Sequence, residues 1–172
     1  MKIKKIPLIS IVGTSKSGKT TFIEKLIPLL RNKGLRIATI KHHHSDFEID
    51  RVGKDTYRHK MAGSSTVILS SPHKIALVRD VEKEVSLGDI VSHYIDDADI
   101  IITEGYKKEE THKIEIFRYA KKVSPLCLHD KTILAVVTDM HIDRDIPQFS
   151  LDDVEGVAKF INTLLCLGNK DL

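Results

Sequence analysis

Eight consecutive residues near the start of the chain have the spacing of a phosphate-binding loop. Residues 13–20 read Gly-Thr-Ser-Lys-Ser-Gly-Lys-Thr, which matches the pattern G-x-x-x-x-G-K-[ST]. The glycines allow the backbone to wrap around a phosphate and to point its N–H groups at the oxygens. We expect Lys19 to reach the β- and γ-phosphates and the Thr20 hydroxyl to bind Mg²⁺. The predicted nucleotide-binding residues of this segment are Gly13, Thr14, Ser15, Lys16, Ser17, Gly18, Lys19, Thr20 and Thr21.

An acidic residue for the same site is predicted at the end of a later buried strand, at residues 99–103. P-loop NTPases place a carboxylate there, which holds Mg²⁺ directly or through water. Glu104 follows this strand, and Gly105 then allows a turn close to the ligand. We therefore predict Lys19 and Glu104 as catalytic residues, with Thr20 and Glu104 as metal ligands. Asp139, after a second apolar strand, is a candidate for contact with the base, although such an Asp is also typical of turns.

The elements around the loop are those that the motif requires. An apolar run at residues 6–12 precedes it and predicts a strand. An amphipathic helix follows and ends near Gly34, with Pro28 expected to bend it. Its apolar face is formed by Phe22, Ile23, Leu26, Ile27 and Leu30.

Strands and helices alternate along the rest of the chain. Further strands are predicted at residues 35–41, 66–70, 74–79, 99–103, 113–119 and 132–137. Helices are predicted at residues 54–62 and 86–95, and a last helix is expected to be capped by Ser150. This order predicts an α/β protein of the P-loop NTPase class, with a mostly parallel, doubly wound sheet flanked by helices on both faces. We expect one nucleotide-binding domain over residues 1–172.

A dense cluster of basic, imidazole and acidic side chains follows the predicted strand at residues 35–41. It could bind a transition metal, bind an anionic second ligand, or form a solvated loop. Consecutive histidines of an extended segment point to alternate faces, so His42, His43 and His44 cannot all reach one metal without a bend. The candidates for a second ligand in this segment are Lys41, His42, His44, Lys54 and Arg58.

Composition limits the other classes of function. The 172 residues are 41% hydrophobic and 30% charged with a formal charge of +3, which is typical of an ordered globular protein. No long Lys/Arg block predicts nucleic-acid binding, and no run reaches the ~20 apolar residues of a membrane span. Cys127 and Cys166 lack metal or redox spacing. We expect a cytoplasmic protein with buried or inert thiols.

The sequence resembles the MobB family of molybdopterin-guanine dinucleotide biosynthesis accessory proteins. The resemblance rests on the loop at 13–20 together with four later segments, and it spans about residues 7–140. Those segments are Thr-Ile-Lys-His-His-His at 39–44, Asp-Arg-Val-Gly-Lys-Asp-Thr-Tyr-Arg at 50–58, Ala-Gly at 62–63 and Thr-Glu-Gly-Tyr-Lys at 103–107.

The resemblance implies a homodimeric GTP-binding protein of the molybdenum cofactor pathway with weak GTPase activity. It would assist a MobA-type nucleotidyltransferase, which joins GMP to molybdopterin to give molybdopterin guanine dinucleotide. By matching position, Lys19 and Thr20 would hold phosphate and Mg²⁺, Glu104 would be the late-strand acid, and Asp50 would face the same Mg²⁺ or its waters. Lys107 joins the candidates for a second ligand.

Some features of related GTPases are missing. The guanine-specific Asn/Thr-Lys-x-Asp motif is absent, so a preference for GTP over ATP follows from the resemblance alone. The second lysine that dimeric relatives of the wider class have in the phosphate loop is also absent, because position 14 is a threonine. We find no evident water-orienting Gln or arginine finger, which predicts slow hydrolysis. A small-molecule P-loop kinase and a nickel-insertion metallochaperone GTPase are the alternative functions.

Overall fold

The structure, a computed structural model, describes residues 6–121 and 123–167. These residues form two compact units, one made of the segments up to His42 and from Asp97 onward, and a smaller one at His43–Asp96. The single domain expected over residues 1–172 stays a prediction. None of the described helices is long and apolar enough to cross a membrane.

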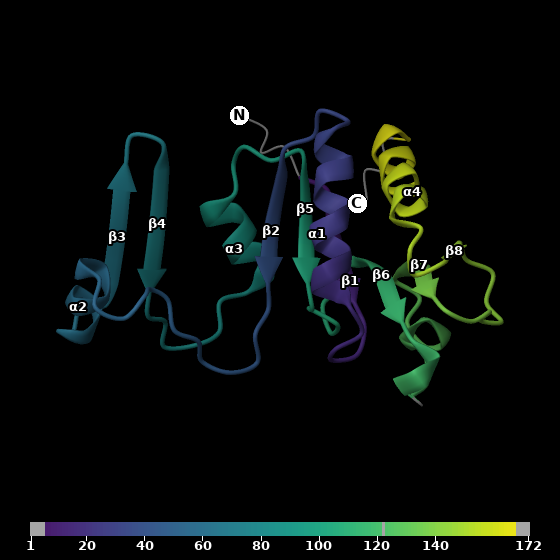
Figure 1. Cartoon of the computed structure of the whole chain (residues 1–172), viewed down its shortest axis with the longest axis horizontal. Coiled ribbons are helices and arrows are strands. Elements are labelled where there is room, and N and C mark those ends of the chain that lie inside the picture. The colour runs from purple at the N-terminus through teal and green to yellow at the C-terminus, as the bar shows by residue number, and fades with distance from the viewer. Residues whose placement is uncertain (1–5, 122, 168–172) are drawn as a thin grey trace. The chain divides into compact units, whose positions relative to one another are not determined.

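The larger unit is built on a six-stranded parallel sheet (Figure 1). The strands lie in the order β2-β5-β1-β6-β7-β8 and all adjacent pairs run parallel. Their bounds are β1 Leu8–Val12, β2 Ile37–Lys41, β5 Ile100–Glu104, β6 His112–Phe117, β7 Ile133–Thr138 and β8 Gln148–Phe149. The predicted fold class is confirmed. The two-residue β8 was not predicted, because so short a strand has no apolar alternation to detect.

Two long helices, α1 (Lys19–Arg31) and α4 (Val154–Cys166), cover the same face of this sheet. The core there joins Ile9 and Ile11 of β1 with apolar side chains of both helices. Helix α1 continues through Pro28, and Gly34 follows it at φ 83°.

On the other face, Val12, Phe117 and Val136 pack with Cys127 from the short 3-10 helix η2 (Leu126–Leu128) and with Ile142. A second 3-10 helix, η1 (Tyr119–Lys121), follows β6.

The prediction that Ser150 caps the last helix is wrong. Asp153 is the N-cap of α4, and its Oδ1 accepts the Gly156 N–H at 2.9 Å. Ser150 only accepts a backbone hydrogen bond from the Asp153 N–H through its carbonyl oxygen. Both residues are good capping types, and the helix begins at the one that lies directly before Val154.

The smaller unit consists of a β-hairpin and two short helices. Strands β3 (Thr66–Ser71) and β4 (Lys74–Arg79) pair antiparallel as a separate two-stranded sheet. Helix α2 spans Asp55–Met61, and α3 spans Leu87–Tyr94. Ser86 caps α3 as expected, because its hydroxyl oxygen accepts the Asp89 N–H at 3.1 Å.

Buried polar side chains tie β6 to the loop before β7. The Glu115 carboxylate accepts the Leu126 and Cys127 N–H groups at 2.9 and 2.8 Å. Burial, together with the charge of Glu115, raises the pKa of the Cys127 thiol to about 11, so this thiol stays protonated at neutral pH. Cys166, in contrast, is exposed, so only one of the two thiols is buried.

The ion pair between Lys113 and Asp130 supplies a test of this region. Lys113 Nζ lies 2.8 Å from Asp130 Oδ2, and the Lys113 side chain is only 4% exposed. We expect Lys113→Ala to lower the free energy of unfolding by about 2 kcal/mol, since the partly buried Asp130 carboxylate keeps its hydrogen bonds from Thr132 but loses its charged partner. Chemical denaturation measures this loss. Lys131→Ala, which removes an exposed lysine nearby, should change stability by less than about 0.5 kcal/mol.

The same pair makes stability depend on pH. Burial of Asp130 opposes its ionisation, but hydrogen bonds from Lys113 and Thr132 outweigh burial and hold its pKa below the ordinary value of 3.8. Its stabilising effect is therefore complete above that value and is lost as pH falls through the lower pKa of the folded state. A Lys113→Ala variant that lost stability with acid as steeply as the wild type would contradict this assignment.

Candidate functional site

The loop at residues 13–18 joins β1 to α1 and is closely packed against β6. Gly13 has φ 143°, and a Cβ there would overlap the carbonyl oxygen of Ile116 and lie 3.0 Å from Ser17 Oγ. Gly18 has φ 99° and is the N-cap of α1, where no side chain caps the helix. The first N–H groups of α1 are therefore not satisfied by a capping side chain. Together with the positive end of the helix dipole, they suit an anion.

Lys19 lies across the loop that precedes it. Its ammonium donates to the carbonyl oxygens of Thr14 at 2.8 Å and Gly13 at 3.3 Å. Partial burial lowers its pKa below 10.5; Glu104 opposes this, and the nearby charges of Lys107 and Lys41 add to the lowering. The loop thus curves around a cation that faces further cations, an arrangement that an anionic ligand would stabilise.

Ser17 carries an unpaired polar atom in this loop. Its side chain is fully buried, and its hydroxyl makes no hydrogen bond to the part of the chain that the structure describes. A buried hydroxyl without a partner is rare and points to a water or ligand that completes the site. The cradle therefore fits a phosphate group on its own geometry.

Glu104 meets Thr20 at the edge of the loop, although 84 residues separate them in sequence. The Thr20 hydroxyl lies 2.8 Å from Glu104 Oε1 and 2.9 Å from Oε2. Lys41 Nζ lies 3.5 Å from Oε1. This contact follows from the parallel register that places Glu104 beside Ile11, just before the loop. A hydroxyl and a carboxylate side by side are the oxygen ligands that Mg²⁺ prefers.

Aromatic and basic side chains continue the site from the ends of β2 and β5. The rings of His42 and Tyr106 are 4.8 Å apart between centroids. Gly105 has φ 101°, and a Cβ on it would lie 3.3 Å from the Cβ of His42. Tyr106 is buried at φ 56°. Of the predicted candidates for a second ligand, Lys41, His42 and Lys107 therefore belong to the unit that holds the loop.

The other candidates for a second ligand, His44, Lys54 and Arg58, belong to the smaller unit, as does Asp50, which was predicted to face Mg²⁺. Asp50 accepts hydrogen bonds from the Thr56 hydroxyl and from the Arg51 N–H, and these hold its pKa below the ordinary value. Arg58 pairs with Asp55 at 3.8 Å. The predicted role of Asp50 in Mg²⁺ binding stays a prediction. Within residues 6–121 and 123–167, no three His, Cys, Asp or Glu side chains form a group that could hold a metal.

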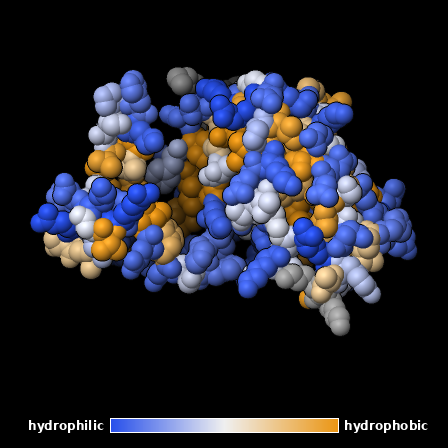
Figure 2. Space-filling model, in the orientation of Figure 1, coloured by the Kyte–Doolittle hydropathy of each residue, from blue (hydrophilic) through white to orange (hydrophobic). Residues whose placement is uncertain are grey.

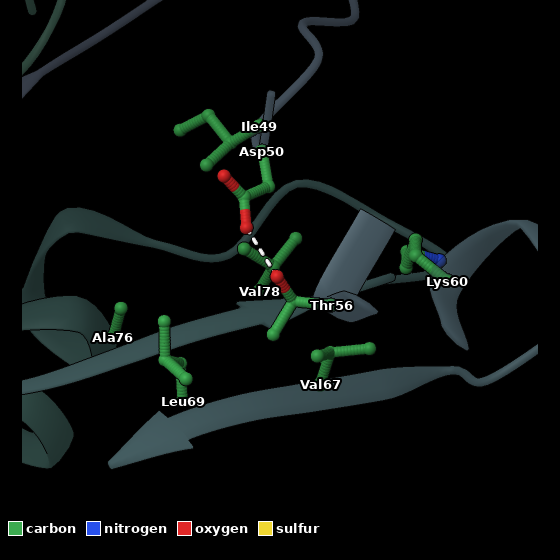
Figure 3. A pocket seen from close by; sticks show the side chains of 8 residues that line it. All are labelled: Ile49, Asp50, Thr56, Lys60, Val67, Leu69, Ala76 and Val78. Atoms are coloured by element: carbon green, nitrogen blue, oxygen red, sulfur yellow. Dashed lines mark hydrogen bonds between the residues drawn. The ribbon is translucent and has the colours of Figure 1, made fainter. Parts of the chain in front are cut away.

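Asp50 also lines a small cavity within the smaller unit (Figure 3). The cavity has a volume of about 140 Å³, and the hairpin and α2 form most of its wall. Its lining residues are Ile49, Asp50, Thr56, Lys60, Val67, Leu69, Ala76 and Val78. The wall is mainly apolar, with the hydrogen bond from Thr56 to Asp50 at one end.

Arg118 and Asp139 follow β6 and β7, on the side of the loop away from Glu104. Asp139 Oδ1 accepts the N–H of Tyr119, which lies 20 positions earlier, at 2.9 Å, so this contact joins two segments and is not a local turn. Contact of Asp139 with a base stays a prediction. Arg118 was not predicted. Its Nε donates to the Ser17 carbonyl oxygen at 2.9 Å. Only the pairing of β6 with β1 brings this side chain to the loop, and the sequence offers no motif that indicates this pairing.

Comparison with known proteins gives a consistent result. A family model described as "MobB: Molybdopterin guanine dinucleotide synthesis protein B" matches residues 8–139. The chain is 38% identical to the molybdopterin-guanine dinucleotide biosynthesis adapter protein of Haemophilus influenzae, over 93% of this chain and 90% of that protein. The protein of the same name from Escherichia coli is 37% identical, over 91% of each.

Solved structures agree with this result. A crystal structure of molybdopterin-guanine biosynthesis protein B (mobB) has 36% identity and a TM-score of 0.75, over 92% of this chain and 98% of that one. The Bacillus subtilis MobB structure, at 23% identity with a TM-score of 0.74 over 92% of this chain and 97% of that one, shares the fold.

Because Gly13 lies so close to β6, adding a single methyl group at this position should disturb the loop. We expect Gly13→Ala to abolish measurable binding of a nucleoside triphosphate, because the Cβ would collide with a backbone oxygen and push the loop off its strand. Gly34→Ala is the matched control, since Gly34 also has positive φ but has open space around it. It should cost about 1 kcal/mol of stability and leave binding intact. Calorimetric titration measures the affinity of both variants for the nucleoside triphosphate. Equal losses of affinity in Gly13→Ala and Gly34→Ala would contradict the proposed collision with the Ile116 carbonyl oxygen.

Proposed function

The chain belongs to the MobB family, and we propose that it acts as a GTP-binding adapter protein in the synthesis of molybdopterin guanine dinucleotide. The observation that carries the GTP-binding part is the group of Lys19, Thr20 and Glu104 at one end of the sheet. In this proposal the loop holds the phosphates of GTP, and Thr20 with Glu104 holds Mg²⁺. The biosynthetic role is supported by the family and by the printed names of the relatives.

Hydrolysis by the isolated protein should be slow. Mg²⁺, when bound, would neutralise charge on the phosphates, while Lys19 would bind them and α1 would direct its first N–H groups at them. Lys19 now donates to Gly13 and Thr14, so it must exchange these carbonyl oxygens for phosphate oxygens when GTP enters. These groups orient the ligand, and none of them is placed as a base toward water. The proposal therefore assigns binding as the main activity and weak GTPase turnover as a secondary one.

A second ligand fits the basic end of the same unit. Lys41 and Lys107 lie close enough to Lys19 to lower its pKa, and His42 packs against Tyr106 beside them. Two ammonium groups and an aromatic ring suit a phosphorylated heterocycle. We propose that molybdopterin, or its guanine dinucleotide, is bound here, and that a MobA-type nucleotidyltransferase in the cytoplasm is the partner that receives it.

Titration with nucleotides tests the GTP site. We expect the wild type to bind Mg-GTP, and Lys19→Ala to lower that affinity at least about 10-fold, since a charge-assisted hydrogen bond to phosphate is lost. Lys25→Ala, which removes an exposed lysine of the same helix, should bind like the wild type. Isothermal calorimetry measures all three proteins.

Three results would count against the proposal. Absence of GTP binding by the wild type would reject it. Tighter binding of Mg-ATP, with release of ADP only when an acceptor is present, would favour a kinase. Tight binding of Ni²⁺ that is lost in a His42→Ala, His44→Ala variant would favour a metallochaperone.

The hairpin of the smaller unit supports the proposal of a homodimer. One face of the hairpin carries Ile68, Ile75 and Leu77, which are 54%, 70% and 44% exposed. Figure 2 shows hydrophobic surface on this part of the chain, at the left of the view. A lone two-stranded sheet is at best marginally stable in water, and exposed apolar side chains of this kind mark interfaces. We propose that a second copy of the chain packs against this exposed face of the hairpin.

Charge on this face should break the dimer. We expect Ile75→Lys combined with Leu77→Lys to shift the sedimenting species from dimer to monomer, because each lysine would have to be desolvated in the interface. Ser71→Lys is the control, since Ser71 shares the opposite face with Val67 and Leu69. It should leave the dimer intact. A wild type that sediments as a monomer throughout the micromolar range would reject the proposed dimer.

A further inference from the structure

Arg118 is a cation at the phosphate loop that no motif in the sequence indicates. It directly follows β6, whose last five residues are buried, so its backbone position is fixed by the sheet. Its Nε donates to the Ser17 carbonyl oxygen at 2.9 Å. Its Nη2 would lie 3.4 Å from a Cβ built on Gly18, so the guanidinium lies beside the N-cap of α1.

The charge at this position is unfavourable without a ligand. The N-terminal end of a helix is positive and attracts anions, so the helix dipole of α1 disfavours a guanidinium beside Gly18. No carboxylate of the described chain forms an ion pair with Arg118. Its four Nη hydrogens make no hydrogen bond to the described residues, while one hydrogen bond to Ser17 holds it in place. An arginine held in this way is preorganised for an anion.

The order of the strands indicates which part of the nucleotide Arg118 would meet. Glu104, on the Mg²⁺ side, ends β5, and Arg118 follows β6 on the opposite side of β1. Asp139, the candidate for base contact, follows β7 one strand further on, and its carboxylate binds the Tyr119 N–H next to Arg118. A nucleotide with its metal-bound phosphates at Thr20 and Glu104 and its base toward β7 would pass its α-phosphate by Arg118.

We propose that Arg118 is a nucleotide-binding residue whose guanidinium contacts the α-phosphate. The inference rests on the proposed function, because it takes a guanine nucleotide as the ligand of the loop. The buried hydroxyl of Ser17, which has no hydrogen-bond partner among the described residues, independently indicates that the loop binds a ligand. Arg118 therefore acts on mono-, di- and triphosphates alike, whereas Lys19 acts on the β- and γ-phosphates.

Affinities for Mg-GTP and Mg-GDP distinguish these roles. We expect Arg118→Ala to lower both affinities by the same factor, roughly 10-fold, so that their ratio stays at the wild-type value. Lys19→Ala should lower GTP affinity more than GDP affinity and change the ratio. Arg118→Lys should recover part of the loss, because it keeps the charge without the planar fork.

A purely structural role is tested by melting temperature without nucleotide. Loss of the hydrogen bond to Ser17 is offset by relief of repulsion, so Arg118→Ala should lower Tm by less than about 2 °C. Arg144→Ala is the matched control, since Arg144 donates to the carbonyl oxygens of Cys127, Asp130 and Ile133. It should lower Tm clearly and leave both nucleotide affinities at the wild-type value.

Other results would contradict either the role of Arg118 or the proposed function. If Arg118→Ala bound both nucleotides with wild-type affinity, or lost affinity for Mg-GTP alone, the role of Arg118 at the α-phosphate would be rejected. Neither result would contradict the proposed function. Loss of affinity together with a fall in Tm as large as that of Arg144→Ala would assign Arg118 to loop structure. A wild type that binds neither nucleotide would overturn the proposed function and this inference with it.

Discussion

Parallel pairing of β1 with both of its neighbours is the interaction on which the site depends. Glu104 of β5 lies beside Ile11, and Ile114 of β6 lies on the other side of the same residue. Because parallel strands end at one edge, the residues that follow β1, β5 and β6 must meet there. Thr20 reaches Glu104, and Arg118 reaches Ser17, only because this register holds. The collision of a Cβ on Gly13 with the Ile116 carbonyl shows how closely the loop is packed against that edge.

The charges of the larger unit are arranged for a ligand with several negative charges. Lys19 and Lys41 lie near one carboxylate, Glu104, and Lys107 acts on Lys19. Arg118 lies on the other side of β1, where it donates to the Ser17 carbonyl oxygen. Without a ligand, backbone oxygens and this carboxylate partly neutralise them: Lys19 binds two carbonyls, and Lys41 lies near Glu104. A nucleotide with Mg²⁺ would replace these contacts with stronger, charge-assisted ones. The same cations explain why the proposed second ligand is also an anion.

The two units differ in how much apolar surface they bury. The larger one has an extended core on both faces of its sheet. In the smaller one, Val67 and Leu87 are buried, while Phe47, Val52 and Ile75 are largely exposed. Few buried contacts and a lone hairpin are typical of segments that open easily or are completed by a partner. The proposed nucleotide site therefore lies in the unit with the extended core, and the surface proposed for dimer formation lies in the sparsely packed unit.

The sequence by itself determined the features that depend on neighbouring residues. The phosphate loop, the helix after it, the Ser86 cap and the α/β alternation were all predicted, because glycine spacing, capping pairs and apolar periods are local signals. Glu104 was predicted because it ends the most continuous buried strand. Distant contacts could not be predicted in this way.

The tertiary structure alone decided which side chains meet across strands. Arg118 reaches the loop, Glu115 binds the Cys127 backbone, and Asp153 rather than Ser150 caps the last helix. Sheet order and register set the first two contacts, and the third follows from the start of α4 at Val154, directly after Asp153. Residues 101 positions apart, such as Ser17 and Arg118, leave no periodic trace of their contact in the chain. The physical reason is that the pairing and register of strands depend on which faces of the whole sheet are buried. That burial exists only when the complete fold has formed.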